Sequence, residues 1–337
     1  MKITLVHNPG AGDGQNSRNL IRLMSEAGHS VRLASVKDDW KAELRKAADL
    51  VAAAGGDGTV RRVALEAAAR GLPFAAIPIG TANNIAKSLG LLGDAGELIE
   101  SWSESPRHAH PFDLGEAIAP WGEARFVEAV GAGLIGALIE REDDVAEHGK
   151  FLGREMDRAL HLLCELVRDA KPRRWIIEAD GEEHSGLWFA VEVLNIRFVG
   201  PNLPLAPEAF PGDGKLDLVL LGEKDREALL AYLEDRMHLA AAELPEFRTL
   251  TAREFVTQAP AGIRWHLDDR NWPKEAPAKS RATVTVRCLP AAATFIAAPK
   301  ARSPSPSSQP RSDRRPQNTP APSADGRPAR RSRGSGS

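Results

Sequence analysis

The sequence lacks the features that would place it in an oxidising compartment or inside a membrane. Only two cysteines occur, Cys164 and Cys288, so no disulfide framework is expected and both thiols are predicted to be reduced and buried. The longest apolar run, Ala129 to Ile139, is about half as long as a membrane span requires. The N-terminal run from Met1 to Val6 is too short for the apolar part of a signal peptide and is typical of a strand. We therefore expect a cytoplasmic protein.

Two familiar nucleotide-binding signatures are also missing. No Gly-Lys-Ser/Thr sequence of a P-loop occurs, and Gly56-x-Gly58 is followed by Arg61 where a dinucleotide fingerprint needs its third small residue. The nine histidines show no metal-ligand spacing apart from His108-x-His110, which is expected to face solvent. These absences argue against a P-loop enzyme, a classical dinucleotide-binding enzyme and a histidine-based metal centre.

The composition is that of an ordinary globular protein with an unusual C-terminal tail. The chain has 337 residues, enough for two domains, with 42% hydrophobic and 27% charged residues. Residues 299–337 are rich in Pro, Ser, Arg and Gly, have almost nothing to bury, and are predicted to be a disordered basic tail. From Lys300 onward the tail has nine basic residues against two acidic ones, a net charge of about +7, whereas the whole chain carries −2.

Two interpretations of this tail stay open. It could be a solvated linker end, or it could adsorb to anionic phospholipid, where each basic residue near the surface adds about 1 kcal/mol. The second interpretation predicts a protein that binds peripherally to the inner face of the membrane. No aromatic residue interleaves the arginines of the tail, so nucleic acid is not expected as a partner.

The stretch Gly55-Gly56-Asp57-Gly58-Thr59 organises the rest of the chain. A short apolar run, Asp49 to Ala54, precedes it, and a run of strong helix formers from Val60 to Ala69 follows. A glycine turn between a strand and a helix suits an anion such as phosphate, because the helix start offers unpaired N–H groups. A carboxylate repels phosphate there unless a cation or a proton intervenes, so Asp57 is predicted to have a metal-linked or proton-handling role.

The first third of the chain alternates between strands and helices, which predicts a doubly wound parallel sheet with helices on both faces. The predicted strands are Lys2–Val6, Val31–Val36, Asp49–Ala54 and Phe74–Ile79, and the predicted helices are Ser17–Ala27, Lys41–Ala48, Val60–Ala69 and Ile85–Leu89. Three of these strands end in Gly/Asn-rich loops. Ligands of such sheets bind at the carboxyl ends of strands, so we expect the loops to converge on one crevice.

After about His110 the strands follow one another more directly, which predicts an antiparallel sandwich or barrel. The predicted strands are Phe112–Gly115, Ala124–Val130, Trp175–Ala179, Leu187–Asn195, Lys215–Leu221 and Thr283–Val286, with helices at Arg154–Asp169 and Lys224–Leu239.

A second polar glycine loop, Gly80-Thr81-Ala82-Asn83-Asn84, occupies the equivalent place after the neighbouring strand. With this companion, the sequence resembles the diacylglycerol kinase catalytic family, which includes sphingosine and ceramide kinases and bacterial lipid kinases. The segments that carry the resemblance are Asn8–Gly12, Gly55–Thr59, Ile77–Ala86 and Leu205–Asp217. The matches run from about residue 3 to residue 290.

The resemblance implies an N-terminal α/β nucleotide domain of NAD kinase/diacylglycerol kinase type, residues 1–115, and a C-terminal antiparallel β-sandwich-like lipid domain, residues 116–298. The last strands could return to the first domain. ATP would be contacted by Asn8, Gly56, Asp57, Gly58, Thr59, Val60, Arg61, Arg62, Thr81, Asn83 and Asn84. Asp213 would bind a structural Mg²⁺ together with the backbone oxygens of Phe210 and Lys215, since oxygen ligands suit that cation, or Asp213-Gly214 is a plain turn before the strand. Asp113 matches an acidic position that helps to organise the site in relatives, or it is an ordinary surface turn residue.

The chain departs from the family pattern where the catalytic acid should stand. The segment from Trp265 to Trp272 places Arg270 at the position of the Glu in the family's Asp-Gly-Glu motif, and a guanidinium cannot act as a base. Asn84 replaces a usual Asp, and Arg61-Arg62 replaces a polar–acidic pair. The predicted nucleotide cleft is therefore more cationic than in typical relatives.

Two explanations of Arg270 compete. Another acid could accept the proton of the acceptor hydroxyl, with Asp268, Asp269, His266 and Asp57 as candidates. Alternatively, the chain is a catalytically weak or inactive relative that binds nucleotide or lipid.

We favour an ATP- and Mg²⁺-dependent kinase that phosphorylates a hydroxyl of a diacylglycerol-like or sphingoid lipid at a membrane surface. A kinase for a soluble metabolite such as NAD is a weaker hypothesis, because the hallmark at residues 205–217 follows the lipid kinases. The sequence does not indicate which lipid is used or which oligomeric state forms.

Overall fold

The structure, a computed structural model, describes residues 1–11, 16–91, 93–103, 108–148, 155–238, 242–275 and 279–296. All of them belong to one compact unit that spans Met1–Arg302. The predicted tail at 299–337, the start of the predicted helix at Arg154 and Gly12 of the first Asn-Pro loop lie outside the described residues.

The N-terminal part contains a parallel sheet, as predicted. Its strands are β1 (Lys2–His7), β2 (Ser30–Ser35), β3 (Leu50–Gly55) and β4 (Phe74–Pro78), in the spatial order β4-β3-β1-β2. All neighbours in this order run parallel. Every residue of the central strand β3 is buried, which explains why that strand consists of small and apolar residues rather than an alternating pattern.

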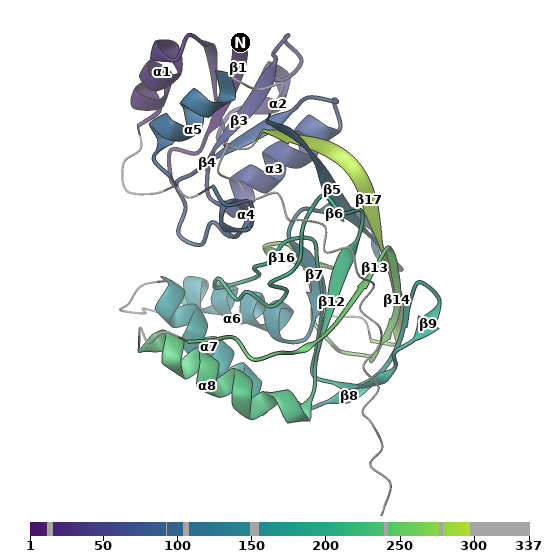
Figure 1. Ribbon diagram of the computed structural model, residues 1–337. Coiled ribbons are helices and arrows are strands. Elements are labelled where there is room, and N and C mark those ends of the chain that lie inside the picture. Colours follow the sequence, from purple (N-terminus) through teal and green to yellow (C-terminus); the bar gives the residue numbers. More distant parts are fainter. Residues whose placement is uncertain are drawn as a thin grey trace, which may run out of the picture. The chain divides into compact units, whose positions relative to one another are not determined.

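Helices cover both faces of this sheet (Figure 1). They are α1 (Ser17–Glu26), α2 (Trp40–Glu43), α3 (Asp57–Ala68), α4 (Asn84–Ser88) and α5 (Ala95–Ser101). Leu20 and Met24 of α1 share one core cluster with Ile99 of α5. On the other face, α2, α3 and α4 contribute to a second cluster that contains Trp40 and Val63. The fold of this part is therefore doubly wound.

The C-terminal part is a sandwich of antiparallel strands. One layer is a six-stranded sheet in the order β13 (Arg248–Ala252), β12 (Leu216–Leu221), β11 (Ala190–Leu194), β7 (Ala129–Ala132), β15 (Trp265–Leu267) and β16 (Arg270–Asn271). The facing layer is built from β5 (Ala109–Ala119), β6 (Gly122–Phe126), β8 (Arg173–Ala179), β9 (Glu182–Glu183), β10 (Gly186–Trp188), β14 (Glu254–Ala259) and β17 (Ala282–Ile296). Trp175, Phe255 and Trp265 lie in the core between the two layers.

Helices cover the outer face of the six-stranded sheet. They are α6 (Leu134–His148), α7 (Glu155–Asp169) and α8 (Arg226–Met237), the last preceded by the 3₁₀ turn η2 (Glu223–Asp225). Figure 1 shows α6, α7 and α8 gathered beside β7 and β12, and their side chains form one core cluster with β11 and β12. The sequence analysis missed α6, because the apolar run at 129–139 contains both the strand β7 and the start of that helix. No described helix is long and apolar enough to cross a membrane.

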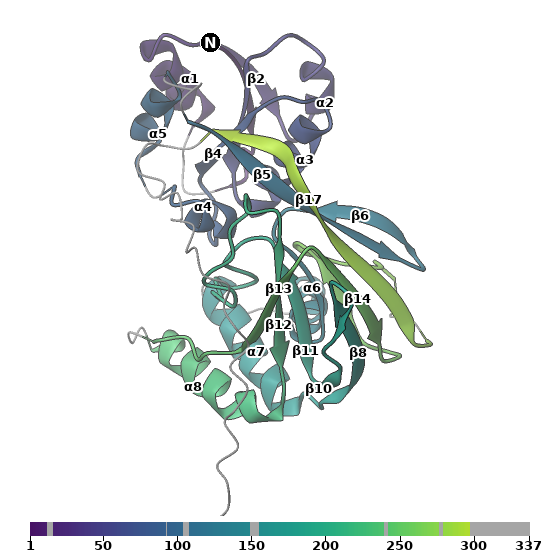
Figure 2. The same cartoon turned by 45° about the vertical axis from the view of Figure 1, so that its right-hand side comes forward.

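The last strand joins the two parts. β17 has 15 residues instead of the short strand predicted at 283–286. It pairs antiparallel with β14 and β5, and Phe295 near its end pairs in parallel with Phe74 of β4. Figure 2 shows β17 running beside β5 from the parallel strands into the antiparallel ones. The parallel strands and one layer of the sandwich thus belong to one 11-stranded sheet within the described residues, and the domain limits at 115 and 298 stay predictions.

Three sequence predictions of secondary structure are wrong in detail. The helix predicted at 41–48 ends at Glu43, because Arg45 N–H and Lys46 N–H bond to carbonyls only three residues back. The strand predicted at 187–195 is split into β10 and β11, which belong to different layers. The strand predicted at 124–130 is also two strands, β6 and β7, since the backbone N–H groups of Val127 and Glu128 between them bond to a side chain instead of a neighbouring strand.

Candidate functional site

The loops that follow β1, β3 and β4 meet at one edge of the parallel sheet, as the sequence predicted. Asn8 Nδ2 donates a hydrogen bond to Thr59 Oγ1 over 3.4 Å, which links the first loop to the second. The second and third loops approach through their backbones: a Cβ placed on Gly80 would lie only 2.4 Å from the Cα of Gly56. Glycine is required here because no side chain fits between the two loops.

Asp57 ties the second loop to the third. Its Oδ2 accepts a hydrogen bond from Asn84 N–H at 2.9 Å, and its Oδ1 accepts one from Ile85 N–H at 3.0 Å. These N–H groups open α4 and have no partner within that helix. Burial raises the pKa of Asp57, although the N–H groups and Lys87 oppose the shift. The geometry explains a carboxylate in a phosphate-type loop by this anchoring contact, and the predicted metal or proton role of Asp57 stays a prediction.

The other predicted residues of the third loop divide into anchored and open ones. Asn83 has a left-handed backbone, with φ of 51°, and its amide group bonds to both N–H and C=O of Gly80. Asn84 is buried, and its Nδ2 donates to Gly200 O at 3.0 Å and to Glu128 Oε2 at 3.4 Å. Thr81 is exposed. Of these residues, only Thr81 offers its side chain to a ligand without giving up a contact that holds the loop.

Residues at the start of α3 present backbone rather than side chains. Thr59 and Val60 are buried, and the Arg62 guanidinium folds back so that Nε donates to Gly58 O at 3.1 Å. No side chain caps the helix at its N-cap residue Gly56. Thr59 N–H and Val60 N–H bond to Gly56 O, so the first two N–H groups of this 12-residue helix, those of Asp57 and Gly58, are available to an anion.

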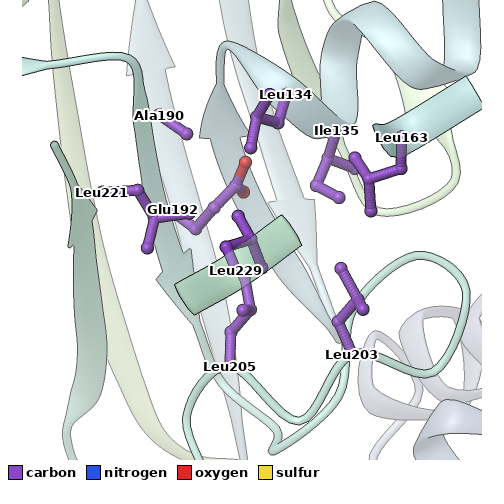
Figure 3. Close-up of a pocket in the computed structure, with 9 residues that line it drawn as sticks. All are labelled: Leu134, Ile135, Leu163, Ala190, Glu192, Leu203, Leu205, Leu221 and Leu229. Carbon is purple, nitrogen blue, oxygen red and sulfur yellow. The ribbon is translucent and has the colours of Figure 1, made fainter. Parts of the chain in front are cut away.

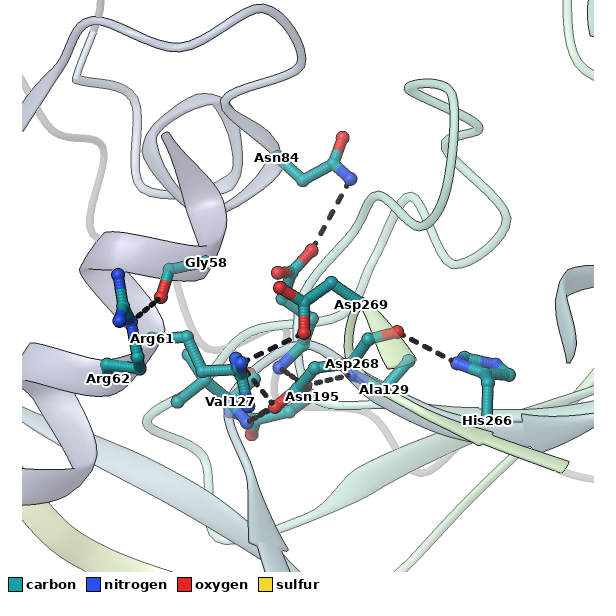
Figure 4. Close-up of polar contacts among 11 residues, drawn as sticks. Gly58, Arg61, Arg62, Asn84, Val127, Ala129, Asn195, His266, Asp268 and Asp269 are labelled. Carbon is teal, nitrogen blue, oxygen red and sulfur yellow. Dashed lines mark hydrogen bonds and ion pairs between the residues drawn. The ribbon is translucent and has the colours of Figure 1, made fainter. Parts of the chain in front are cut away.

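The turn between β15 and β16 carries Asp268, whose carboxylate is occupied by the backbone. It accepts hydrogen bonds from the N–H groups of Val127 at 3.2 Å, Glu128 at 2.8 Å and Ala129 at 3.2 Å (Figure 4). Asp268 itself has a positive φ of 52°. Burial raises the pKa of Asp268 to about 6, although Arg61 and the three N–H groups favour the charged form.

Asp269, the next residue, faces α3. Its Oδ1 lies 2.9 Å from Arg61 Nη2, and a Cβ on Gly58 would lie 2.7 Å from its Oδ2. Arg61 is buried and also approaches Asp268, with Nε 3.8 Å from Oδ2. Asp269 remains about half exposed, with 47% of its side chain accessible. Arg270 is exposed; its backbone pairs with Leu267 of β15, and its side chain makes no hydrogen bond or ion pair with any residue that the structure describes.

Glu128 is a buried carboxyl group at this site that the sequence analysis missed. Its carboxylate contacts Asn84 and lies near three other acids, Asp57, Asp268 and Asp269. Burial raises the pKa of Glu128 well above its ordinary value, and the negative charges of these acids add to the shift. A single acid inside the apolar run from Phe126 to Ala132 was the available signal, because such a residue must be buried with a partner or a purpose.

The candidate Mg²⁺ loop, residues 210–215, is built differently from the turn that carries Asp268 and Asp269, which we call the acid turn. Phe210 O accepts from Gly212 N–H at 2.8 Å, and Asp213 Oδ1 accepts from Lys215 N–H at 2.9 Å. Burial raises the pKa of Asp213, and the charge of Asp113 adds to the shift. A carboxylate oxygen and backbone carbonyl oxygens are the kind of ligand that a hard cation prefers, but the described residues contain no group of three or more His, Cys, Asp or Glu side chains that could hold a metal.

Asp113, which anchors this loop, is not a surface turn residue. It is buried, and its carboxylate accepts from Gly214 N–H and Ala291 N–H, each at 2.7 Å. Through Gly58, Arg61 and Asp269, the structure brings together the predicted nucleotide loops and the acid turn.

Comparisons with known proteins identify the two parts of the chain. Residues 2–117 match the model of the diacylglycerol kinase catalytic domain, and residues 139–297 match that of the YegS C-terminal NAD kinase beta sandwich-like domain. A diacylglycerol kinase of Mycobacterium tuberculosis is 28% identical over 233 residues, which cover 67% of this chain and 72% of the relative. A diacylglycerol kinase of Bacillus subtilis is also 28% identical, with 64% of this chain and 72% of the relative covered.

A solved structure shows the same fold. The crystal structure of a diacylglycerol kinase from Bacillus anthracis superposes with a TM-score of 0.65, covering 88% of this chain and 97% of that chain, at 18% sequence identity.

The contact between the two glycine loops predicts the effect of Gly80→Ala. The new Cβ would overlap a backbone atom of Gly56, which cannot move away by rotation, so we expect a loss of about 1–3 kcal/mol in the free energy of unfolding. Hydrogen exchange at the Ile85 amide should accelerate more than the global loss requires. The control is Gly93→Ala, whose Cβ would meet only the end of the Glu97 side chain. Equal stability of the two variants would contradict the argument.

The burial of Glu128 predicts how stability depends on pH. Unfolded Glu128 titrates near its ordinary pKa of 4.5 and the folded group titrates higher, so between these values the folded state binds more protons and stability falls as pH rises. Glu128→Gln lacks this titration. In urea unfolding from pH 4 to pH 8, the free energy of unfolding of the variant should rise relative to that of the wild type above about pH 4.5, by at most about 1.4 kcal/mol per pH unit. The exposed Glu183→Gln serves as control, and a difference that does not change with pH would refute the prediction.

Proposed function

Because the chain belongs to the diacylglycerol kinase catalytic-domain family, we propose that it transfers the γ-phosphate of ATP to a hydroxyl group of a diacylglycerol-like or sphingoid lipid. The observation that supports this most directly is the position of Asp269. Its carboxylate lies beside Gly58 at the start of α3, where the two glycine loops leave backbone N–H groups open to phosphate. A phosphate donor and a proton acceptor would then meet at one place, which phosphoryl transfer requires.

In this proposal ATP is held mainly by backbone. The N–H groups at the start of α3 would bind phosphate oxygens, and the exposed Thr81 hydroxyl would add a contact from the third loop. Mg²⁺, held by Asp213 with the backbone oxygens of Phe210 and Lys215, would supply positive charge that organises the loop. At the start of α3 the buried Arg61 compensates part of the negative charge of Asp268 and Asp269, which would otherwise repel a polyphosphate.

Asp269 is the best placed of the candidate acids to accept the proton of the lipid hydroxyl. The carboxylate of Asp268 is buried and bonded to three backbone N–H groups, and that of Asp57 holds two. Asp269 is half exposed, and its ion pair with Arg61 keeps it oriented toward α3. His266 is completely buried and does not reach this surface. Arg270 therefore stands next to the acting acid rather than in place of a missing one.

The lipid character of the acceptor is supported by the family alone. A lipid substrate also motivates the proposal that the chain works in the cytoplasm, peripherally bound to the inner face of the membrane, with the basic residues of 299–337 attracted to anionic headgroups.

The proposed chemistry predicts a large effect of Asp269→Asn. With labelled ATP, Mg²⁺ and a panel of diacylglycerol and sphingoid lipids, the wild type should label one lipid class. The variant should lose about 10²–10⁴-fold in kcat with little change in the KM for ATP, because only the proton acceptor is removed. The exposed acid variant Glu183→Gln is the matched control.

Two results of this assay would overturn parts of the proposal. Binding of ATP without any labelled lipid would reject the kinase and favour a non-catalytic binding protein. Full activity of Asp269→Asn would show that Asp269 is not the proton acceptor.

The membrane proposal predicts that deletion of residues 299–337 weakens sedimentation with anionic vesicles. Nine basic residues in the tail make the loss largest at low salt, and it should shrink as ionic strength rises. Neutral phosphatidylcholine vesicles are the control. Unchanged binding of the truncated protein to anionic vesicles would remove the membrane role of the tail.

A further inference from the structure

His266 and Glu192 form a buried polar pair directly behind the acid turn. Nε2 of His266 lies 2.6 Å from Oε2 of Glu192, and both side chains are almost completely inaccessible. Nδ1 of His266 lies 3.0 Å from the backbone oxygen of Asp268 (Figure 4). A carbonyl oxygen can only accept a hydrogen bond, so Nδ1 carries a proton and donates it to Asp268 O.

The sheet is shaped to bring this pair together. Glu192 on β11 and His266 on β15 both stand opposite Gly131 of the strand β7 between them. A Cβ at position 131 would lie 1.8 Å from Glu192 Oε2, so only glycine lets the carboxylate reach across β7 to the imidazole. The pair therefore depends on Gly131, because any side chain at that position would occupy the space of the Glu192 carboxylate.

The surroundings make the pair costly. Glu192 is the one polar residue among those that line a cavity of about 10 Å³, room for about one water molecule, and its Oε1 has no partner among the described residues. Figure 3 shows its carboxylate surrounded by leucine and isoleucine side chains. Burial disfavours the charged imidazole, but the adjacent Glu192 outweighs this and the pKa of His266 is raised on balance. Apolar residues would fill the same space at less cost, so stability alone does not account for the pair.

The hydrogen bond from His266 to Asp268 O connects the pair to the acid turn. Asp268 has a left-handed backbone, with φ of 52°, a conformation that a residue with a side chain rarely adopts and that persists where contacts enforce it. The carbonyl that His266 holds belongs to the peptide unit between Asp268 and Asp269. The orientation of that peptide determines where the Asp269 side chain begins.

We propose that His266, supported by Glu192, is a positioning residue that fixes the Asp268–Asp269 peptide so that the Asp269 carboxylate lies beside the start of α3. The inference rests on the proposed function, because it assigns a task to His266 through Asp269. It adds a second layer to the site, which runs from the cavity through Glu192, His266 and Asp268 O to the surface of α3.

Two substitutions separate the two hydrogen bonds of the imidazole. In His266→Asn, the side-chain N–H₂ can take the place of Nδ1 and still donate to Asp268 O. In His266→Gln, the longer side chain can take the place of Nε2 and keep the contact with Glu192, but it gives up the one with Asp268. Since Asn leaves the Glu192 carboxylate without its partner, that variant is also made together with Glu192→Gln, which removes the charge.

We expect the double variant, His266→Asn with Glu192→Gln, to keep kcat for lipid phosphorylation within about fivefold of wild type. His266→Gln should lose at least tenfold in kcat. The KM for ATP should change little in either, because the nucleotide loops are untouched. The exposed His161→Gln on α7 is the matched control. Equal losses in the two variants, or a greater loss with Asn, would refute the positioning role.

Hydrogen exchange decides the inference independently of activity. The amides of Glu128 and Ala129 donate to the Asp268 carboxylate, so they report whether the turn is held. Exchange at these amides should be at least tenfold faster in His266→Gln and unchanged in the double variant, with global stability followed by thermal unfolding. If the wild type phosphorylates no lipid but this exchange pattern appears, the proposed function fails and His266 still holds the turn. Unchanged exchange in His266→Gln would refute the inference in any case.

Discussion

The rest of the site depends on the hydrogen bonds that three consecutive backbone N–H groups, those of residues 127–129, donate to the Asp268 carboxylate. They end the pairing of β6 before β7 begins, and they turn the chain so that Glu128 points inward toward Asn84. They also fix the turn that carries Asp269. A hydrogen bond to a charged group contributes about 1.5–3 kcal/mol, and three together offset much of the cost of burying that charge.

Each acid near α3 meets a different physical demand. Asp57 satisfies the unpaired N–H groups of α4, Asp268 satisfies those of residues 127–129, and Glu128 is buried among negative charges that disfavour its ionised form. Asp269 alone combines exposure with an ion pair, to the buried Arg61. The same residue type therefore performs anchoring, capping and, as we propose, proton transfer, and only the surroundings distinguish these roles.

Local patterns predicted the N-terminal part of the fold well and the rest less well. The alternation of strands and helices, the glycine turn at 55–59 and the family resemblance are properties of neighbouring residues, and the structure and the comparisons confirm them. The break at Val127 depends on a side chain 141 residues away, which no local window contains. The Glu192–His266 pair is hidden for the same reason, because its two members are 74 positions apart in the chain. The capping contact of Asp57 is hidden too, because the N–H groups that it holds belong to residues 27 and 28 positions later in the chain.

The strand β17 determines when the parallel sheet can be completed during synthesis of the chain. Its residues bond to β14 and β5 of the sandwich and, through Phe295, to β4 of the parallel sheet, where Phe74, Phe112 and Phe295 pack with ring centroids 5.1–6.4 Å apart. The edge of β4 is thus completed by chain synthesised some two hundred residues later. A ribosome that has released only the nucleotide loops has made a sheet with an open edge, and the phosphate-binding half reaches its final form only when the last strand arrives.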